Sequence, residues 1–188
     1  MLYSELQCSE AIRKAVERMG FAEMTEIQEK TIPVMLAGHD VIAKAPTGTG
    51  KTCAFGIPVA EHIQPENKYP QAVIMAPTRE LAQQIAEELS NLTYFMPEVQ
   101  VACVYGGANM EKQAKRLAEG CQIVVATPGR LMDHYKHHSI DISHVTQIVL
   151  DEADEMLNMG FYKDVRHIIE MMKARKSLSM FSATISRE

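Results

Sequence analysis

The segment from Val41 to Thr52 constrains the fold of this chain more than any other part of its sequence. A short apolar run leads into a glycine-rich turn that ends in Lys51-Thr52, the order expected where a strand feeds a helix. Glycines in the turn let successive backbone N–H groups point into one concave space, and the following helix adds the positive end of its dipole. The segment therefore predicts a phosphate-binding loop between a strand and a helix.

The side chains at the end of this turn indicate a nucleoside triphosphate and its metal ion. Lys51 is expected to reach the β- and γ-phosphates, and the hydroxyl of Thr52 to bind Mg²⁺. Ala45 stands where the pattern G-x-x-x-x-G-K-[ST] usually has its first glycine, so an ordinary glycine turn before a helix stays open on this segment alone. The residues expected to bind the phosphates are Thr47, Gly48, Thr49, Gly50, Lys51 and Thr52.

Composition limits the partners of the chain. Its 188 residues are 46% hydrophobic and 23% charged, which is typical of one soluble globular domain. No run approaches the roughly 20 apolar residues that cross a bilayer, and the first residues carry no secretion signal. We therefore expect a monomeric, cytoplasmic protein without a membrane partner. The net charge of −5 argues against bulk electrostatic coating of nucleic acid, so any such contact must be local.

Cysteine and histidine spacing gives little support for a metal site or a disulfide framework. Four cysteines lie far apart without a C-x-x-C pair, which predicts buried thiols. They are Cys8, Cys53, Cys103 and Cys121. His134 and His138 have the i, i+4 spacing of a metal-binding pair, but no third ligand of suitable spacing stands nearby. A solvated helix face is the favoured interpretation of the two histidines.

Helical and strand-like patterns alternate along the chain. Helices are predicted from Glu10 to Met19, from Thr25 past a kink at Pro33, from Lys51 to about Ile63 with an interruption at Pro58, and from Arg79 to Leu92. The second of these is expected to turn Ile27, Thr31, Val34 and Met35 inward. Strands are predicted from Val41 and over residues 72–76, 99–104, 123–126, 148–150 and 178–182. This alternation indicates an α/β fold with a parallel sheet and helices on both faces.

Three of the predicted strands end in a turn that begins a helix. The turns are Pro46–Thr52, Pro77–Glu80 and Thr127–Arg130. In parallel sheets, ligands bind beyond the carboxyl ends of the strands, where helix N-termini attract anions. Thr78 and Thr127 are well placed as N-caps, and each of the last two turns adds an arginine. Phosphate contact and simple helix capping therefore both stay open for these two turns.

Two carboxylates follow the apolar run from Ile148 to Leu150. In phosphate-loop enzymes an acidic residue at this point holds Mg²⁺, and a neighbouring carboxylate can orient and deprotonate the attacking water. Asp151 is predicted to take the first role and Glu152 the second. The alternative is an acidic helix start stabilised by the helix dipole. The coincidence with Lys51 on a separate strand of the same sheet favours the catalytic interpretation.

Together these motifs resemble the DEAD-box family of ATP-dependent RNA helicases. Asp151-Glu152-Ala153-Asp154 spells the family name, and the other matching stretches, in the family's order, are 20–28, the phosphate loop, 77–82, 106–107, 127–130 and 182–184. The resemblance implies a RecA-like, three-layer α/β domain that uses ATP and Mg²⁺. It further implies that Gln28 reads the adenine edge and that Thr25 supports Gln28. Tyr3, seventeen residues before Gly20, would stack on the base.

The same resemblance assigns residues to RNA and to coupling. The sugar-phosphate backbone of single-stranded or duplex RNA would be contacted by Thr78, Arg79, Gly107, Thr127 and Arg130. Ser182 and Thr184 would link the nucleotide state to strand separation, and Asp154 would pair with that segment.

Two positions depart from the family pattern. Tyr3 stands where Phe is usual and Met24 where Pro is usual, so a stacking ring is kept while the entry to Gln28 is less rigid. The stretch from Thr25 to Gln28 is also typical of a capping box, in which Gln28 bonds back to the N–H of Thr25. Both roles of Gln28 are compatible, because an amide has two donors and an acceptor with two lone pairs.

The family has a second lobe of similar fold that completes both sites and supplies an arginine finger, worth about 10³–10⁵ in turnover. We expect residues 1–188 to be the amino-terminal ATP-binding lobe, with 1–38 as an adenine-sensing flank and 39–188 as the RecA-like core. Such a lobe would bind without appreciable turnover. An adaptor that never hydrolyses ATP is the competing function, and the presence of Glu152 favours the enzyme. Another phosphate-loop ATPase would not account for Gln28, Arg79 and Arg130 together.

Overall fold

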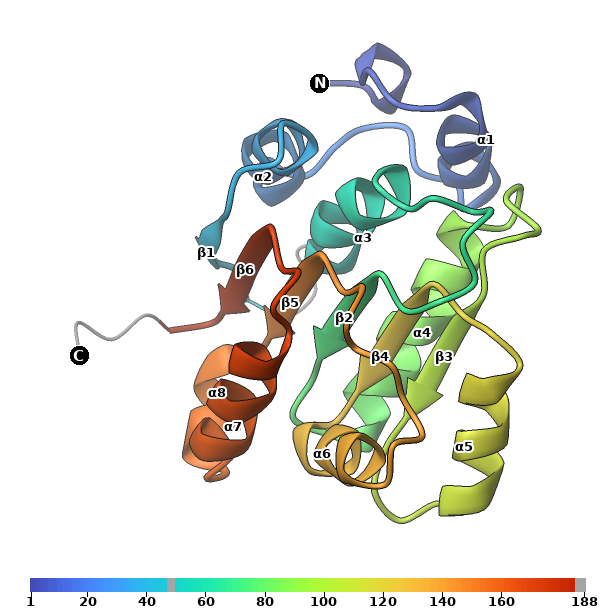
Figure 1. The fold of residues 1–188 in the computed structure, drawn as a ribbon. Coiled ribbons are helices and arrows are strands. Elements are labelled where there is room, and N and C mark those ends of the chain that lie inside the picture. The colour runs from blue at the N-terminus through green and yellow to red at the C-terminus, as the bar shows by residue number, and fades with distance from the viewer. Residues whose placement is uncertain (47–49, 185–188) are drawn as a thin grey trace.

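The structure is a computed structural model that describes residues 1–46 and 50–184, and within them six strands form one sheet. The strand order is β1-β6-β5-β2-β4-β3, and every neighbouring pair runs parallel. The strands are β1 Ile42–Lys44, β2 Ala72–Met75, β3 Val101–Val104, β4 Ile123–Ala126, β5 Gln147–Asp151 and β6 Ser177–Ser182. Because parallel strands need crossover connections, a helical segment lies between each strand and the next (Figure 1).

Helices cover both faces of this sheet. A short 3₁₀ helix, Tyr3–Glu5, precedes α1 Glu10–Arg18, α2 Glu26–Leu36, α3 Lys51–Glu61, α4 Arg79–Leu92, α5 Met110–Ala118, α6 Pro128–Lys136, α7 Ala153–Asn158 and α8 Tyr162–Met171. The first four pack in one apolar cluster and the last four in the other, on opposite sides of the sheet (Figure 1). The predicted α/β architecture with helices on both faces is confirmed.

Burial on both faces of the sheet explains why the central strands are continuous apolar runs in the sequence. In β2, Ala72 and Ile74 belong to the cluster beneath α1 to α4, while Val73 and Met75 belong to the cluster beneath α5 to α8. Side chains of a strand alternate between the two faces, so a strand covered on both faces has no position left for water. Every residue of β2, β4 and β5 is buried.

The predicted interruption of the third helix at Pro58 is wrong. Helix α3 continues through Pro58 to Glu61, and α2 likewise continues through Pro33 to Leu36. An interior proline removes one backbone hydrogen bond and crowds the preceding turn. Nine of the eleven residues of α3 are buried, so tertiary packing holds the helix together across that position.

The predicted inward face of the second helix is wrong at Val34. Val34 is 40% exposed, and the buried residues of α2 are instead Gln28, Thr31, Ile32 and Met35. These four still follow helical spacing, but the buried stripe begins on a polar residue, Gln28. A search for apolar residues alone therefore places the buried face incorrectly.

Several strand limits also differ from the sequence prediction by one or two residues. Strand β3 begins at Val101 rather than at residue 99, and β5 extends through Asp151. The extension matters for the site, because the first carboxylate of the acidic segment is fixed by the sheet itself. No helix within residues 1–46 and 50–184 is both long and apolar enough to cross a lipid bilayer.

Candidate functional site

Lys51 and the two carboxylates predicted to act with it meet at the carboxyl edge of the sheet. Lys51 begins α3, Asp151 ends β5, and Glu152 follows directly. The ammonium of Lys51 lies 3.1 Å from Asp151 Oδ1 and 3.3 Å from Glu152 Oε1. Lys51 is 6% exposed and Asp151 is fully buried, so these charges interact largely out of water. The sequence prediction that these three side chains converge is confirmed.

Asp151 is held in an orientation that leaves one oxygen unused. Its Oδ1 accepts the backbone N–H of Glu152 at 3.0 Å as well as facing Lys51. Its Oδ2 is buried and has no hydrogen-bond partner among the described residues. Burial raises the pKa of Asp151, and the ammonium of Lys51 opposes that shift. A buried carboxylate oxygen without a donor is a position suited to a cation ligand.

Glu152 stands at a strained point of the backbone. Its φ of 50° lies in the left-handed region that residues with a side chain seldom adopt. The turn from β5 into α7 forces this conformation and aims the carboxylate back toward Lys51. Strain of this kind clusters at functional sites, where the position of one side chain outweighs its cost.

Gly50 is required at the start of α3 for two reasons. Its φ of 78° is left-handed, and a Cβ atom there would lie 2.5 Å from Gln28 Nε2. Only glycine lets the end of the predicted phosphate loop approach the Gln28 amide so closely. The predicted phosphate ligands Thr47, Gly48 and Thr49 lie outside the described residues. Thr52 lies in the first turn of α3, at the positive end of its dipole.

Gln28 performs the capping role and also contacts the phosphate-loop segment. Its Oε1 accepts the N–H of Thr25 at 3.0 Å and the hydroxyl of Tyr3, and its Nε2 donates to the carbonyl of Gly50 at 3.0 Å. Both lone pairs of Oε1 are therefore in use, and one N–H of the amide has no partner within the described part of the chain. Gln28 is 3% exposed.

Tyr3 is packed closely against this amide. It is buried and its ring lies 6.4 Å from that of Phe21, while burial raises the pKa of its phenol. A cavity of about 470 Å³ runs past these groups and contains Tyr3, Gln28, Lys51 and Thr52 among its lining residues. The predicted adenine-site residues Tyr3, Thr25 and Gln28 thus share one cavity with Gly50, Lys51 and Thr52 of the predicted phosphate site. Stacking of Tyr3 on a base stays a prediction.

The segments that follow β2, β3 and β4 carry the predicted RNA contacts. Thr78 caps α4 by accepting the N–H of Leu81 at 3.2 Å, as predicted. The guanidinium of Arg79 lies 4.7 Å from the centre of the Tyr105 ring, so it rests on a neutral aromatic face. Tyr105 leads into Gly106 and Gly107, the next predicted contact segment. Gly107 has φ 84° and lies beside Arg79.

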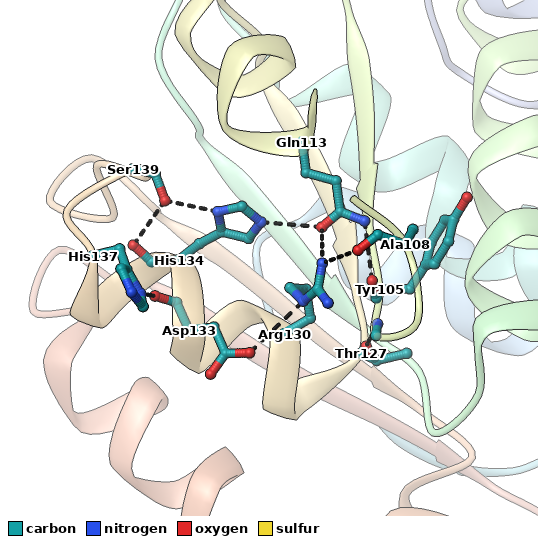
Figure 2. A network of polar contacts seen from close by, with 10 residues as sticks. Tyr105, Ala108, Gln113, Thr127, Arg130, Asp133, His134, His137 and Ser139 are labelled. Carbon is teal, nitrogen blue, oxygen red and sulfur yellow. Dashed lines mark hydrogen bonds and ion pairs between the residues drawn. The ribbon is translucent and has the colours of Figure 1, made fainter. Parts of the chain in front are cut away.

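Thr127 does not cap α6 with its side chain, so that part of the prediction is wrong. Its hydroxyl accepts the backbone N–H of Gly106 at 3.3 Å instead, and Pro128 at the first helical position needs no acceptor. Arg130, one turn into α6, donates to the carbonyl of Ala108 at 3.0 Å (Figure 2). The glycine-rich loop between β3 and α5 therefore contacts both arginine-bearing turns.

The acidic segment also contacts the end of β6. Asp154 Oδ2 accepts both the hydroxyl and the N–H of Thr184, at 2.9 and 3.2 Å, and the N–H of Asp154 donates to the hydroxyl of Ser182 at 3.0 Å. Burial alone would raise the pKa of Asp154, but these hydrogen bonds outweigh it and lower the pKa. The predicted contact is present; its coupling role stays a prediction.

His134 contradicts the prediction of a solvated histidine face. It is completely buried, whereas His138 is exposed, so the two do not form a pair. His134 contacts Gln113, which was not singled out from the sequence. The apolar residues Leu131 and Met132 on the inner side of α6 give the signal that could have found it, since His134 shares that side. Within the described ranges, no group of three or more His, Cys, Asp or Glu residues could hold a metal ion.

The cysteines match their prediction in part. Cys53 and Cys121 are buried free thiols, while Cys8 and Cys103 are only half-buried. Burial raises the pKa of Cys121 to about 11 and that of Cys103 to about 11. Thiols with such pKa values stay protonated and unreactive near neutral pH.

A parallel sheet whose carboxyl edge brings Gly50-Lys51 at a helix start against two strand-end carboxylates defines a phosphate-loop nucleotide-binding protein. The family model for the DEAD/DEAH box helicase matches residues 25–188. The chain belongs to this family.

Relatives and solved structures agree with this assignment. The chain is 50% identical over 188 residues to the ATP-dependent RNA helicase CshA of Limosilactobacillus reuteri, covering 100% of this chain and 38% of that protein. It is 50% identical over 183 residues to CshA of Listeria monocytogenes, covering 97% of this chain and 35% of that protein. The chain thus spans little more than a third of the length of these curated relatives.

The crystal structure of a DEAD box protein from Methanococcus jannaschii superposes with a TM-score of 0.91 at 41% identity, over 100% of this chain and 51% of that one. A hypothetical ATP-dependent RNA helicase from Sulfolobus tokodaii gives a TM-score of 0.88 at 41% identity, over 95% of this chain and 52% of that one. The predicted RecA-like domain is confirmed by these neighbours.

Proposed function

We infer that this chain is the amino-terminal ATP-binding lobe of an ATP-dependent RNA helicase that remodels short RNA duplexes or ribonucleoproteins. The observation that carries the proposal is the position of Lys51 between Asp151 and Glu152, with Asp151 Oδ2 left without a partner among the described residues. A structural ion pair would not need a buried carboxylate oxygen without a donor, since such an atom costs free energy.

The nucleotide would lie along the cavity that joins Gln28 to Lys51. Gln28 would pair with the adenine edge, with support from Thr25, and Tyr3 would stack on the base. The loop from Thr47 to Thr52 would surround the phosphates. Asp151 and Thr52 would hold Mg²⁺, which neutralises phosphate charge when bound. Glu152 would accept a proton from the attacking water. Its strained backbone fixes the carboxylate close to Lys51.

RNA would be held through its backbone at the neighbouring strand ends. Thr78, Arg79, Gly107, Thr127 and Arg130 come from three turns that the loop between β3 and α5 ties together. Contacts to sugar and phosphate position a nucleic acid without reading its sequence. Because the whole chain carries a net charge of −5, this local patch should bind RNA weakly and lose affinity steeply as salt rises.

A second lobe is part of the proposal, because the curated relatives are more than twice as long as this chain. Lys51 and the N-terminal dipole of α3 are placed to neutralise the transferring phosphate. The further cation that such reactions use, worth about 10³–10⁵ in rate, would come from that lobe. The lobe alone would therefore bind nucleotide and RNA without appreciable turnover.

The test compares the 188-residue chain with the same chain joined covalently to the remaining length of a CshA relative. Phosphate release and strand separation are measured for both, with and without RNA. We expect nucleotide binding by the chain alone, and RNA-stimulated hydrolysis and unwinding only in the joined protein. Glu152→Gln in the joined protein serves as the control for contaminating ATPase. Strong RNA-stimulated hydrolysis by the 188-residue chain alone would contradict the proposal of a site shared between lobes.

A further inference from the structure

One buried amide connects the loop between β3 and α5 with the turn that begins α6. Gln113, on the second turn of α5, donates from Nε2 to the carbonyl of Tyr105 at 3.0 Å. Its Oε1 accepts Nη1 of Arg130 at 3.1 Å and lies 3.1 Å from His134 Nε2 (Figure 2). Gln113 is 8% exposed, so it reaches these partners from the interior and not from the surface that RNA would contact.

The orientation of this amide is fixed by its partners. The carbonyl of Tyr105 can only accept, and the guanidinium of Arg130 can only donate, so the nitrogen of the amide faces the first and its oxygen the second. His134 must then carry its proton on Nε2 in order to donate to the same oxygen. The other ring nitrogen lies 2.7 Å from the hydroxyl of Ser139, which locks the ring from behind (Figure 2).

Arg130 is therefore held by neutral atoms. Its Nη1 is shared between Gln113 Oε1 and the carbonyl of Ala108, at 3.1 and 3.0 Å. The nearest carboxylate, Asp133, lies 3.7 Å from Nε and its side chain is 56% exposed, so solvent screens it. Nη2 of Arg130 donates no hydrogen bond within residues 1–46 and 50–184. The guanidinium is thus fixed in place while its charge is left for an anion.

We propose that Gln113 is a positioning residue of the RNA site, which holds the guanidinium of Arg130 against the Gly106-Gly107 loop with a neutral acceptor. This proposal rests on the proposed function, because it takes Arg130 as a backbone-phosphate contact. It adds a residue beyond the predicted contact set, one that touches no RNA and acts through another side chain.

The test uses two variants that separate position from charge. Gln113→Met keeps the length of the side chain and removes its hydrogen bonds, so Arg130 loses its anchor. Gln113→Glu keeps an acceptor for Arg130 and adds a charge that neutralises it. Each is made in the 188-residue chain, alone and together with Arg130→Ala. Binding of a fluorescein-labelled single-stranded oligouridine is followed by anisotropy at several salt concentrations, and ADP affinity is measured alongside.

We expect each single variant to weaken RNA binding about tenfold, the effect of one lost charge-assisted contact, with ADP affinity unchanged. With Arg130→Ala already present, Gln113→Met should not weaken binding further, because Gln113 acts through the absent side chain. The salt dependence of binding should fall by about one phosphate in Gln113→Glu.

Gln100→Glu is the matched control. The side-chain oxygen of Gln100 also accepts a hydrogen bond from an arginine, Arg116, at 3.3 Å, but Gln100 lies just before β3, at the end of that strand away from the proposed RNA site. Gln100→Glu changes the net charge by the same amount as Gln113→Glu and should leave RNA affinity unchanged.

Three results would overturn the proposal. The first is unchanged RNA affinity in Gln113→Met while Arg130→Ala weakens binding, which leaves the proposed function standing. The second is a tenfold loss in Gln113→Met that persists on top of Arg130→Ala. The third is an Arg130→Ala variant that binds RNA like the parent chain, which overturns both this inference and the proposed RNA site. If Gln113→Met fails to bind ADP, the Gln113→Glu variant carries the test.

Discussion

Lys51 of the proposed nucleotide site and Arg130 of the proposed RNA site are both held by close contacts, but their partners differ in charge. Lys51 faces two carboxylates, at 3.1 and 3.3 Å, one of them fully buried. Arg130 is fixed at similar distances by a carbonyl and an amide oxygen, which carry no net charge. The proposed nucleotide site thus sets two close carboxylates against its cation, whereas the carboxylate near Arg130, that of Asp133, lies 3.7 Å from Nε and is 56% exposed.

This difference indicates how each site meets its ligand. Phosphates that entered the proposed nucleotide site would share Lys51 with carboxylates, so binding there would rearrange existing charge contacts, and a cation on Asp151 would have a reason to accompany them. RNA phosphates at the proposed RNA site would meet a guanidinium that is already held in place. A cation between carboxylates, like Lys51, suits a site whose contacts change during a reaction. A cation held by neutral oxygens, like Arg130, suits a site that only binds its ligand.

The largest expected effect distinguishes the two carboxylates around Lys51. Glu152→Gln in the two-lobed protein should lower ATP hydrolysis by about 10²–10⁴-fold, because the amide cannot accept the proton of the attacking water. Binding of Mg·ATP and RNA should stay nearly intact. Asp151→Asn should instead weaken Mg·ATP binding, as expected for a lost metal ligand. The reverse pattern in a nucleotide titration would show that the roles are exchanged.

The next effect tests the comparison of cations directly. Lys51→Ala leaves Asp151 buried without its partner and should lower the free energy of unfolding of the 188-residue chain by about 3–5 kcal/mol. Arg130→Ala removes contacts to neutral oxygens and should cost about 1–2 kcal/mol. Urea unfolding measures both. Equal losses would contradict the distinction between charged and neutral partners.

The pH dependence of the Lys51→Ala deficit has a definite sign. Burial already raises the pKa of Asp151, and removing Lys51 takes away the group that opposes this rise. A carboxyl whose pKa is higher in the folded state favours folding at low pH and opposes it as pH rises. The stability difference between parent and variant should therefore be smaller at pH 5 than at pH 8.

Much of the nucleotide site could be predicted because its chemistry lies in contiguous segments. Lys51-Thr52 and Asp151-Glu152 each follow an apolar run, and a parallel sheet brings the ends of such runs to one edge. The Thr25–Gln28 capping box could also be recognised from adjacent residues. Local order in the sequence was enough in these cases.

The support of the RNA site could not be predicted for the opposite reason. Gln113, His134 and Ser139 belong to α5, α6 and the turn after it, and each is a polar residue whose role depends on burial by other elements. A lone glutamine on an amphipathic helix has no pattern that separates it from a solvated one. The predictions that Val34 is buried and that Pro58 interrupts its helix were wrong for a similar reason. Tertiary packing determines which face of α2 is buried and keeps α3 helical through Pro58.

A smaller effect concerns Gln28, which belongs to the nucleotide site yet has only neutral partners. Gln28→Ala should remove the preference for ADP over GDP, worth about 1–3 kcal/mol, because an amide matches the donor and acceptor edge of adenine and mismatches guanine. Titration of both nucleotides against parent and variant measures it. Ser9→Ala, which removes the cap of α1, is the control for lost capping alone. A Gln28→Ala chain that melts earlier but keeps its preference would leave only the capping role.

The smallest expected effect concerns the hydrogen bonds that Gln28 Oε1 already accepts, one of which must break before adenine can bind to that oxygen. Both lone pairs of its Oε1 are used, by the N–H of Thr25 and the hydroxyl of Tyr3, so the amino group of adenine can reach that oxygen only if one donor leaves. The Tyr3 hydroxyl is the donor whose loss leaves the helix cap intact. Tyr3→Phe should therefore tighten ADP binding about two- to tenfold, the scale of one net hydrogen bond. It should give no gain for purine riboside 5′-diphosphate, which lacks the amino group.

Tyr69→Phe is the matched control, because it removes the hydroxyl of another tyrosine, one that stacks on His144. If Tyr3→Phe weakens both nucleotides equally, the hydroxyl supports the amide and does not compete with adenine, and Gln28 then resembles Arg130 in being held ready for its ligand.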